Sequence, residues 1–367
     1  MLRLSLPHLD DDAIAAAVAV LRSGNLVHGA EGTAFEAELA AYMGVRHAVV
    51  VSSGTAALHL ALVALGVGTG DAVLVPDFTF PATGNVVRLV GARPVLVDVD
   101  PSTYCVTPEG LEAAIDAFRG SERLRAVMPV HEFGQPAAID AIVALSKRYD
   151  LAVVEDAACA IGATLHGRKL GTFGAIGCFS LHPRKTLTTG EGGVLATDDD
   201  ALARRLRRLR SHGIERDAAG LHFVEAGYNL RLTDFQSALG RAQLPKLDSW
   251  VEARRALAAV YLRTLAPLAA AGQLELPKAT EGHSWQTFMT VLPDGVDRAA
   301  VISELAAMGI EANLGAQCLS VLAPFEGCGG GPVASRLYRQ GLALPFCEQY
   351  GPAEVARVAE ALGAALS

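Results

Sequence analysis

Short, uniformly apolar segments that alternate with helical segments dominate the first two-thirds of this 367-residue chain. The expected strands are residues 47–52, 72–75, 93–97, 124–130 and 151–154. Strands that are apolar on both faces are typical of parallel sheets covered by helices on both sides. The alternation therefore predicts an α/β fold built on a mostly parallel central sheet.

Polar residues follow several of these strands at the point where each one ends. Ser53, Gly54 and Thr55 follow the first expected strand, and Glu155 and Asp156 follow the last. In open α/β sheets, ligands bind beyond the carboxyl ends of the strands. We therefore expect a ligand site at this edge of the sheet.

The length of the chain and a change of pattern near residue 245 predict two domains. One hydrophobic core stops growing at about 250–300 residues. One long helical region is expected from Leu239 to about Ala270, interrupted near Pro245. We expect a large α/β domain over residues 1–245 and a smaller α+β domain over residues 246–367.

Acidic residues outnumber basic ones, which argues against a nucleic-acid partner. The 39 Asp and Glu against 31 Lys and Arg give a formal net charge of −8, whereas nucleic-acid binders present clustered basic faces. The one basic run, Arg204–Arg210, has helical spacing and is expected to form a solvated helix face or a subunit contact.

The apolar content, 51% of residues, indicates a large buried core rather than a membrane protein. No apolar run approaches the roughly 18 residues of a spanning helix, and the first residues do not resemble a signal peptide. The six cysteines are scattered, without CxxC pairs or His at ligand spacing. We therefore expect a cytoplasmic protein with no disulfide framework, no metal site and no membrane contact.

Lys185 lies in a glycine- and threonine-rich turn, HPRKTLTTGEGG, shortly after an expected buried strand. A structural lysine normally keeps its ammonium group in water. A desolvated lysine can instead lose its proton and form a Schiff base with an aldehyde. Taken alone, the residue supports both interpretations equally.

Asp156 favours the second interpretation. It follows a buried strand and precedes Ala-Ala-Cys-Ala, whose small side chains let a flat ligand approach. Pyridoxal phosphate (PLP) needs a carboxylate that keeps its ring nitrogen protonated. The alternative role of Asp156 is a helix cap, and Glu155, being adjacent, points elsewhere and receives no role.

A phosphate site is expected where Ser53, Gly54 and Thr55 join a strand to a helix. The turn combines hydroxyl groups with a helix N-terminus, which favours an anion. Ser180 adds a further hydroxyl, and Phe80 is a candidate to stack on a flat ring, its alternative being an ordinary core position. Together with the lysine and the aspartate, these features describe one PLP site.

The order and spacing of several motifs resemble the DegT/StrS-type aminotransferases, a family of fold-type I PLP enzymes that mostly aminate ketones of nucleotide-linked sugars. The similarity covers essentially the whole chain. It rests on SSGTAALHLAL (52–62), PDFTFPAT (76–83), VEDAACAIGA (154–163), FSLHPRKTLTTGEGGVL (179–195) and GYNLRLTDFQSALGRAQL (227–244).

The resemblance implies a role for each candidate residue. Lys185 would be the Schiff-base lysine and Asp156 the partner of the ring nitrogen. The implied cofactor contacts are Phe80 as the stacking ring and Gly54, Thr55 and Ser180 as phosphate ligands. Asn229 is similar to an asparagine that reaches the phosphate from the neighbouring subunit, so a homodimer with two shared active sites is implied.

Three positions depart from the family pattern. Cys159 is also expected to contact the cofactor. It stands where a His or Gln of the family usually hydrogen-bonds near the phenolic oxygen of the cofactor. A thiol is a weaker hydrogen-bond partner than either side chain. Cys318 stands where other members often have a bulkier residue, and Glu132 where a small or aromatic residue is commoner. No specific sugar is therefore inferred.

The hypothesis that follows is a transaminase that moves an amino group from glutamate or glutamine to a keto-sugar or a related cyclic ketone. Amino-sugar, polysaccharide and antibiotic biosynthesis all remain open. The first alternative is a PLP-dependent sugar dehydratase, but such relatives use histidine in place of the lysine. The second is a non-catalytic regulatory relative, which would be expected to lack Lys185 or Asp156.

Overall fold

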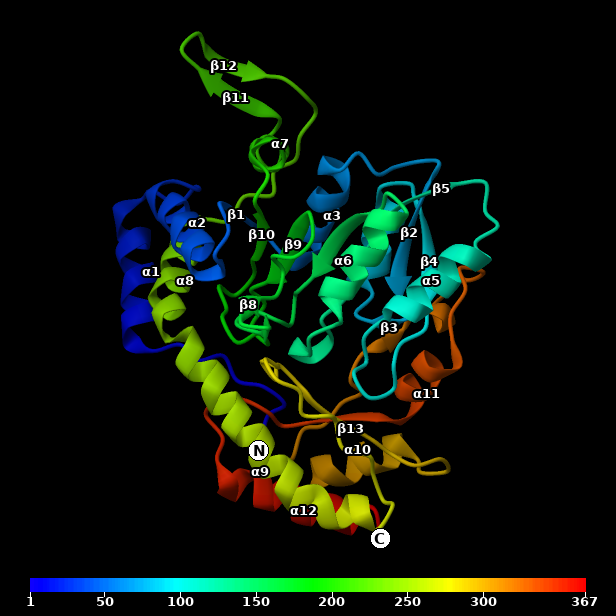
Figure 1. Ribbon diagram of the computed structural model, residues 1–367. Helices are drawn as coiled ribbons and strands as arrows, with labels where there is room; N and C mark the ends of the chain where they lie inside the picture. The colour runs from blue at the N-terminus through cyan, green and yellow to red at the C-terminus, as the bar shows by residue number, and fades with distance from the viewer.

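Seven strands form one central sheet in the computed structural model, which describes residues 1–367 (Figure 1). Their order is β1 (His47–Val51), β10 (Gly193–Thr197), β9 (Ile176–Ser180), β6 (Ala152–Asp156), β5 (Arg123–Val127), β2 (Asp71–Pro76) and β4 (Arg93–Val97). Strand β10 is antiparallel to both of its neighbours, and every other neighbouring pair is parallel. The predicted α/β fold with a mostly parallel sheet is confirmed.

Both faces of the sheet are buried under helices, as the uniformly apolar strands require. In β1, Val50 belongs to one hydrophobic cluster, whereas Val49 and Val51 belong to another. The first cluster lies under α2 (Ala30–Met43), α5 (Pro108–Ala117) and α6 (Ile139–Arg148). The second lies under α3 (Gly54–Ala64), α4 (Ala82–Leu89) and α7 (Asp200–Arg210).

The long helical region predicted near residue 245 is interrupted as expected. Helix α8 (Asp234–Gln243) is followed by a 3₁₀ turn at Leu244–Lys246, which contains Pro245, and then by α9 (Leu247–Ala270). Proline lacks the backbone N–H that a continuous helix needs, so the turn tightens there. Helix α1 (Asp11–Ser23) packs beside α8 (Figure 1).

A third hydrophobic cluster occupies the C-terminal part of the chain. It lies between α9, α10 (Arg298–Ala307), α12 (Pro352–Ala365) and the antiparallel pair β13 (Phe288–Val291) and β15 (Gly341–Leu344). The segment between α10 and β15 returns to the first part, because β14 (Gln317–Cys318) pairs with β3 (Phe78–Thr79) and α11 (Pro332–Gln340) contacts β3. The domain boundary near residue 245 stays a prediction.

Two short hairpins complete the fold: β7 (Thr164–Leu165) with β8 (Arg168–Lys169), and β11 (Ile214–Asp217) with β12 (Gly220–Phe223). The β11–β12 hairpin projects from the body of the molecule as an arm (Figure 1). It carries exposed apolar side chains at Leu221 and Phe223.

The basic run lies on α7, and its side chains are less solvated than the sequence suggested. Arg210 is buried and forms an ion pair with Glu36, and Arg207 contacts the same carboxylate at 3.4 Å. Arg208 pairs with Glu215 and with a second glutamate beside the arm, each at 3.1 Å. The run therefore ties the arm and α2 to α7 through ion pairs. No helix in the structure combines the length and apolar character needed to cross a membrane.

Candidate active site

A cavity of about 360 Å³ lies beyond the carboxyl ends of β1, β5, β6 and β9. Because these strands are mutually parallel, their ends meet at one edge of the sheet, where ligand sites form in this class of fold. The volume falls in the range of small-molecule pockets. The site that the strand-end residues predicted is therefore present as a cavity.

Seven of the eight predicted site residues line this cavity, and one does not. Those that line it are Gly54, Thr55, Phe80, Asp156, Cys159, Ser180 and Lys185. Asn229 lies elsewhere, exposed at the base of the β11–β12 arm, where it forms a β-bridge with Ser211. The structure thus brings the residues together, while the role of each stays a prediction.

The N-terminus of α3 meets Ser180 at one end of the cavity. Ser53 caps the helix, its Oγ accepting a hydrogen bond from the Ala56 N–H at 3.1 Å. A Cβ added at Gly54 would lie 2.8 Å from the Cβ of Ser180, so the glycine is needed for this close approach. The free N–H groups of the first turn and the Ser180 hydroxyl can bind a phosphate there.

Asp156 is almost fully buried at the end of β6. Its Oδ2 accepts a hydrogen bond from Thr83 Oγ1 at 2.8 Å, and its Oδ1 accepts one from the Ala158 N–H at 3.1 Å. Burial raises the pKa of this carboxyl, while the two hydrogen bonds oppose the rise. Thr83 was missed by the sequence analysis, since nothing in the spacing links it to an aspartate 73 residues away.

Glu155 points away from the cavity, as its position next to Asp156 predicted. It accepts hydrogen bonds from the N–H groups of Gly171, Phe173 and Gly174 at 2.6–2.8 Å and contacts His131 Nε2 at 3.0 Å. These contacts hold the loop that leads into β9. The two adjacent acids therefore have separate surroundings, and only Asp156 faces the cavity.

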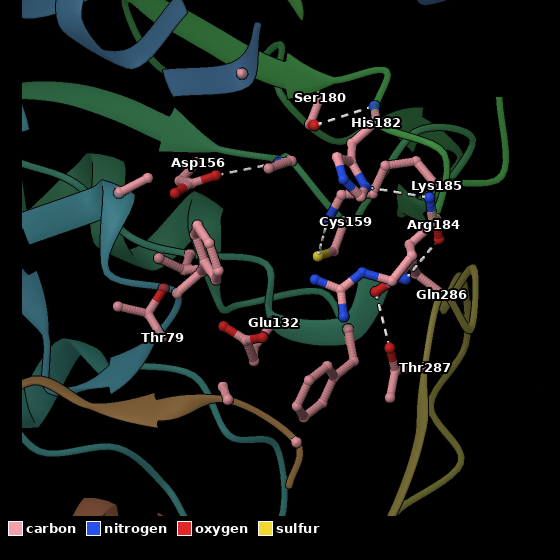
Figure 2. Close-up of a pocket in the computed structure, with 18 of the residues that line it drawn as sticks. Thr79, Glu132, Asp156, Cys159, Ser180, His182, Arg184, Lys185, Gln286 and Thr287 are labelled. Atoms are coloured by element: carbon pink, nitrogen blue, oxygen red, sulfur yellow. Dashed lines mark hydrogen bonds between the residues drawn. The ribbon is translucent and has the colours of Figure 1, made fainter. Parts of the chain in front are cut away.

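The Lys185 amine projects into the cavity and donates to Cys159 Sγ at 2.9 Å (Figure 2). Burial raises the pKa of the Cys159 thiol, which favours its neutral form beside the amine. Lys185 and Asp156 thus line the same cavity from different strand ends. The cavity fits PLP well, because it combines a helix N-terminus that can bind the phosphate with a buried carboxylate and an amine.

Residues from the C-terminal part hold the loop that carries Lys185. Gln286 Nε2 donates to the carbonyl oxygen of Arg184 at 2.9 Å (Figure 2). Arg254, buried and paired with Glu348 at 2.8 Å, donates in turn to the Gln286 carbonyl at 3.3 Å. The sequence analysis missed these residues, since their contacts join segments that are 32 to 102 residues apart in the chain.

Glu132 is a further acid in the cavity wall, and only 4% of it is exposed. Burial, followed by the negative charge of Asp156, raises the pKa of the Glu132 carboxyl to about 8, although the positive charge of Lys185 opposes the rise. Arg184, an exposed residue, also lines the cavity and forms no ion pair there. The cavity therefore holds a second cationic side chain besides Lys185.

Comparisons with known proteins match these features. The model of the DegT/DnrJ/EryC1/StrS aminotransferase family matches residues 7–363. The chain belongs to this family. The resemblance drawn from the motifs is confirmed, and with it the interpretation as an aminotransferase.

Individual relatives agree over nearly their whole length. The UDP-N-acetyl-3-dehydro-α-D-glucosamine 3-aminotransferase of Acidithiobacillus ferrooxidans is 39% identical, with 98% of this chain and 95% of that protein covered. The structure of S. venezuelae DesV in complex with a ketimine intermediate is 36% identical, covers 99% of both chains and has a TM-score of 0.89. A GDP-4-keto-6-deoxymannose-3-dehydratase variant, 26% identical, covers 99% of this chain and 100% of that chain with a TM-score of 0.90.

Proposed function

We propose that this protein uses PLP to transfer an amino group from an amino acid to the ketone of a nucleotide-linked sugar. The observation that carries the proposal is that Lys185 and the buried Asp156 share one cavity with the N-terminus of α3. Membership of a family of PLP-dependent sugar aminotransferases supports the same conclusion.

The residues of the chain divide the work of this reaction. When bound, PLP supplies an electron sink that stabilises negative charge on the carbon bearing the amino group. Asp156 would hold a proton on the ring nitrogen, and the N-terminus of α3 with Ser180 would hold the phosphate. The Lys185 amine would hold the cofactor and, when free, would move the proton at the reacting carbon as acid and base.

The sugar substrate is proposed from the relatives and from the charge of the cavity. The relative from Acidithiobacillus ferrooxidans acts on the 3-keto group of a UDP-linked N-acetylated sugar, according to its name. We infer a substrate of the same kind, a keto-sugar nucleotide. The exposed Arg184 supports an anionic substrate, because a guanidinium pairs well with phosphate or carboxylate oxygens.

We further propose that the active unit is a homodimer in which the arm region reaches the partner's site. Asn229 is exposed and lies outside the cavity of its own chain. The neighbouring arm carries exposed Leu221, Phe223 and Val224, which a partner subunit would cover. Sedimentation of the purified protein should show a dimer. Mixing inactive Asn229→Ala and Lys185→Ala chains should restore part of the activity, because one of the two shared sites in the hybrid dimer keeps both residues.

Cofactor binding and product analysis test the proposal together. The wild type mixed with PLP should develop a visible absorption band, which Lys185→Ala should lack and Lys147→Ala, at an exposed position on α6, should keep. Addition of glutamate should then abolish this absorption band. A UDP-linked 3-keto sugar should become aminated, as measured by mass spectrometry. A wild type without the band would contradict the proposal.

A sugar dehydratase is the alternative, since a member of that class has the same fold. The presence of Lys185 in the cavity favours transamination. A dehydratase would release the sugar hydroxyl as water and leave the product without a new amine. Detection of a dehydrated, non-aminated product with the wild type would therefore support the alternative.

A further inference from the structure

Glu132 is a buried acid in the cavity wall to which the proposed mechanism assigns no role. It belongs to the segment His131–Gln135 that follows β5, and its side chain is almost fully buried. It forms no ion pair, unlike Glu155 nearby, which contacts His131. A buried acid without a cationic partner is costly when ionised, so a neutral form of Glu132 has to be considered.

Glu132 lies among the other ionisable groups that line the cavity. The charges of Asp156 and Lys185 both act on its carboxyl, and its own charge acts on Cys159. In Figure 2 the Glu132 side chain borders the open part of the cavity, with Asp156 to one side in this view and Cys159 to the other. Glu132 therefore belongs to the same group of side chains as the lysine and the aspartate.

The chemistry of PLP decides which of its edges faces this group. Its ring has a nitrogen at one end and an aldehyde carbon at the other, and the two edges between them carry either the phosphate arm or a phenolic oxygen. The phosphate arm would lie beside Gly54 and Ser180, at the N-terminus of α3. The phenolic oxygen would then lie on the other edge, next to the carbon that Lys185 would attack, on the side of the cavity that holds Cys159 and Glu132.

The phenolic oxygen needs a hydrogen-bond donor, and the side chains offer two candidates. The Cys159 thiol is a weak donor and already contacts the Lys185 amine at 2.9 Å. A carboxylic acid is a stronger donor when it keeps its proton. Resting on the proposed function, we propose that Glu132, as a neutral acid, donates a hydrogen bond to the phenolic oxygen of the bound cofactor.

The protonation state of Glu132 follows from all the charged groups around it. Burial and the charge of Asp156 raise the pKa of Glu132 to about 8, and the charge of Lys185 and hydrogen bonds from the Phe133 N–H and the Thr79 hydroxyl work against them. Arg184 and Glu191 also line the cavity, at exposed positions, with opposite charges. Near pH 7 the balance keeps the proton on Glu132.

A neutral donor and an ionised carboxylate have opposite effects on the nitrogen that links Lys185 to the cofactor. A donor stabilises negative charge on the phenolic oxygen, which is largest when the linking nitrogen has lost its proton, and so it lowers the pKa of that nitrogen. An ionised Glu132 would hold the proton on the nitrogen and raise the same pKa. The direction of the change on mutation therefore distinguishes the two states.

The test is a pH titration of the visible spectrum of the PLP-loaded protein, which reports the pKa of the linking nitrogen. Glu132→Leu should raise this pKa by about one to two pH units, the size expected for losing a hydrogen bond to a charged group. Glu132→Gln, whose amide still donates, should stay near the wild type. Glu191→Gln, the control at an exposed position of the same cavity, should not change it.

Several outcomes would overturn the inference. A lower pKa in both Glu132 variants would show an ionised carboxylate, and unchanged values would show no contact with the cofactor. An equal change in Glu191→Gln would indicate a general effect of charge in the cavity. A wild type without any visible band would instead contradict the proposed function.

A measurement without cofactor separates these two failures. The infrared difference spectrum of the cofactor-free wild type minus Glu132→Gln should show the carbonyl stretch of a protonated carboxylic acid at pH 7. Its presence would support the neutral form of Glu132 independently of PLP binding. Its absence would overturn the inference even if the visible band forms normally.

Discussion

Two walls of the cavity are built in different ways. The strand-end wall consists of Ser53–Thr55, Asp156 and Ser180, which lie at the ends of β1, β6 and β9. The loop wall consists of Glu132, in a short 3₁₀ turn, and of Arg184 and Gln286–Thr287, in irregular segments, and it draws on both parts of the chain. Each residue of the strand-end wall is positioned by the strand that it follows or ends. The residues of the loop wall are instead held by hydrogen bonds to segments that are distant in the sequence.

The difference suggests how the two walls divide the proposed function. Contacts of the strand-end wall come from backbone N–H groups and a buried carboxylate, which suit the constant parts of a cofactor. The loop wall supplies side chains of both charges, including the exposed Arg184 and the buried Glu132. Loops on a rigid scaffold commonly carry specificity, so we expect differences between relatives to concentrate in the loop wall.

The largest effect is expected from Asp156 in the strand-end wall. Asp156→Asn keeps the size of the side chain but removes the charge that would hold the proton on the ring nitrogen. Activity should fall by about 100- to 1000-fold, the range seen when a preorganised electrostatic contact is lost. Thr83→Val, which removes only the hydrogen bond of 2.8 Å to this carboxyl, should cost about tenfold. Steady-state kinetics would measure both, and equal losses would contradict the distinction.

A smaller effect is expected from Gly54→Ala in the same wall. The new Cβ would lie 2.8 Å from the Cβ of Ser180, so the helix terminus and the serine must move apart. Overpacking of this kind costs about 1–3 kcal/mol, and PLP affinity should fall with stability. In the control Gly68→Ala, the nearest atom would be 3.6 Å away, so both should stay near the wild type. Thermal unfolding and a PLP titration would measure the changes.

A third effect, expected in the loop wall, is a pH dependence of stability in the cofactor-free protein. The pKa of Glu132 is raised from the ordinary 4.5 to about 8 on folding, so the folded state binds an extra proton between these values. The stabilisation is complete below pH 4.5 and is lost as the pH rises to about 8, by at most about 1.4 kcal/mol per pH unit. Glu132→Gln should lack this loss. Melting temperatures of both proteins from pH 5 to 8 would measure it, and parallel curves would contradict the raised pKa.

The strand-end wall was largely predictable from sequence, and the loop wall was not. Apolar strands followed by Ser53-Gly54-Thr55 or Asp156 are local patterns, and the structure brings these residues to one cavity. Glu132 appeared in the sequence only as a departure from a family pattern, and its burial became visible in the folded chain. Gln286 gave no signal, because its hydrogen bond to the Arg184 carbonyl joins segments 102 residues apart.

The sequence by itself determined the α/β class, the parallel edge where the site lies and the family to which the chain belongs. These properties follow from short-range patterns of apolar residues and from motifs whose order along the chain is visible in the sequence. Only the tertiary structure decided that Glu155 turns to the loop before β9 while Asp156 faces the cavity beside Thr83. It also decided how far Glu132 is desolvated, because burial and the sum of nearby charges depend on segments that meet only after folding.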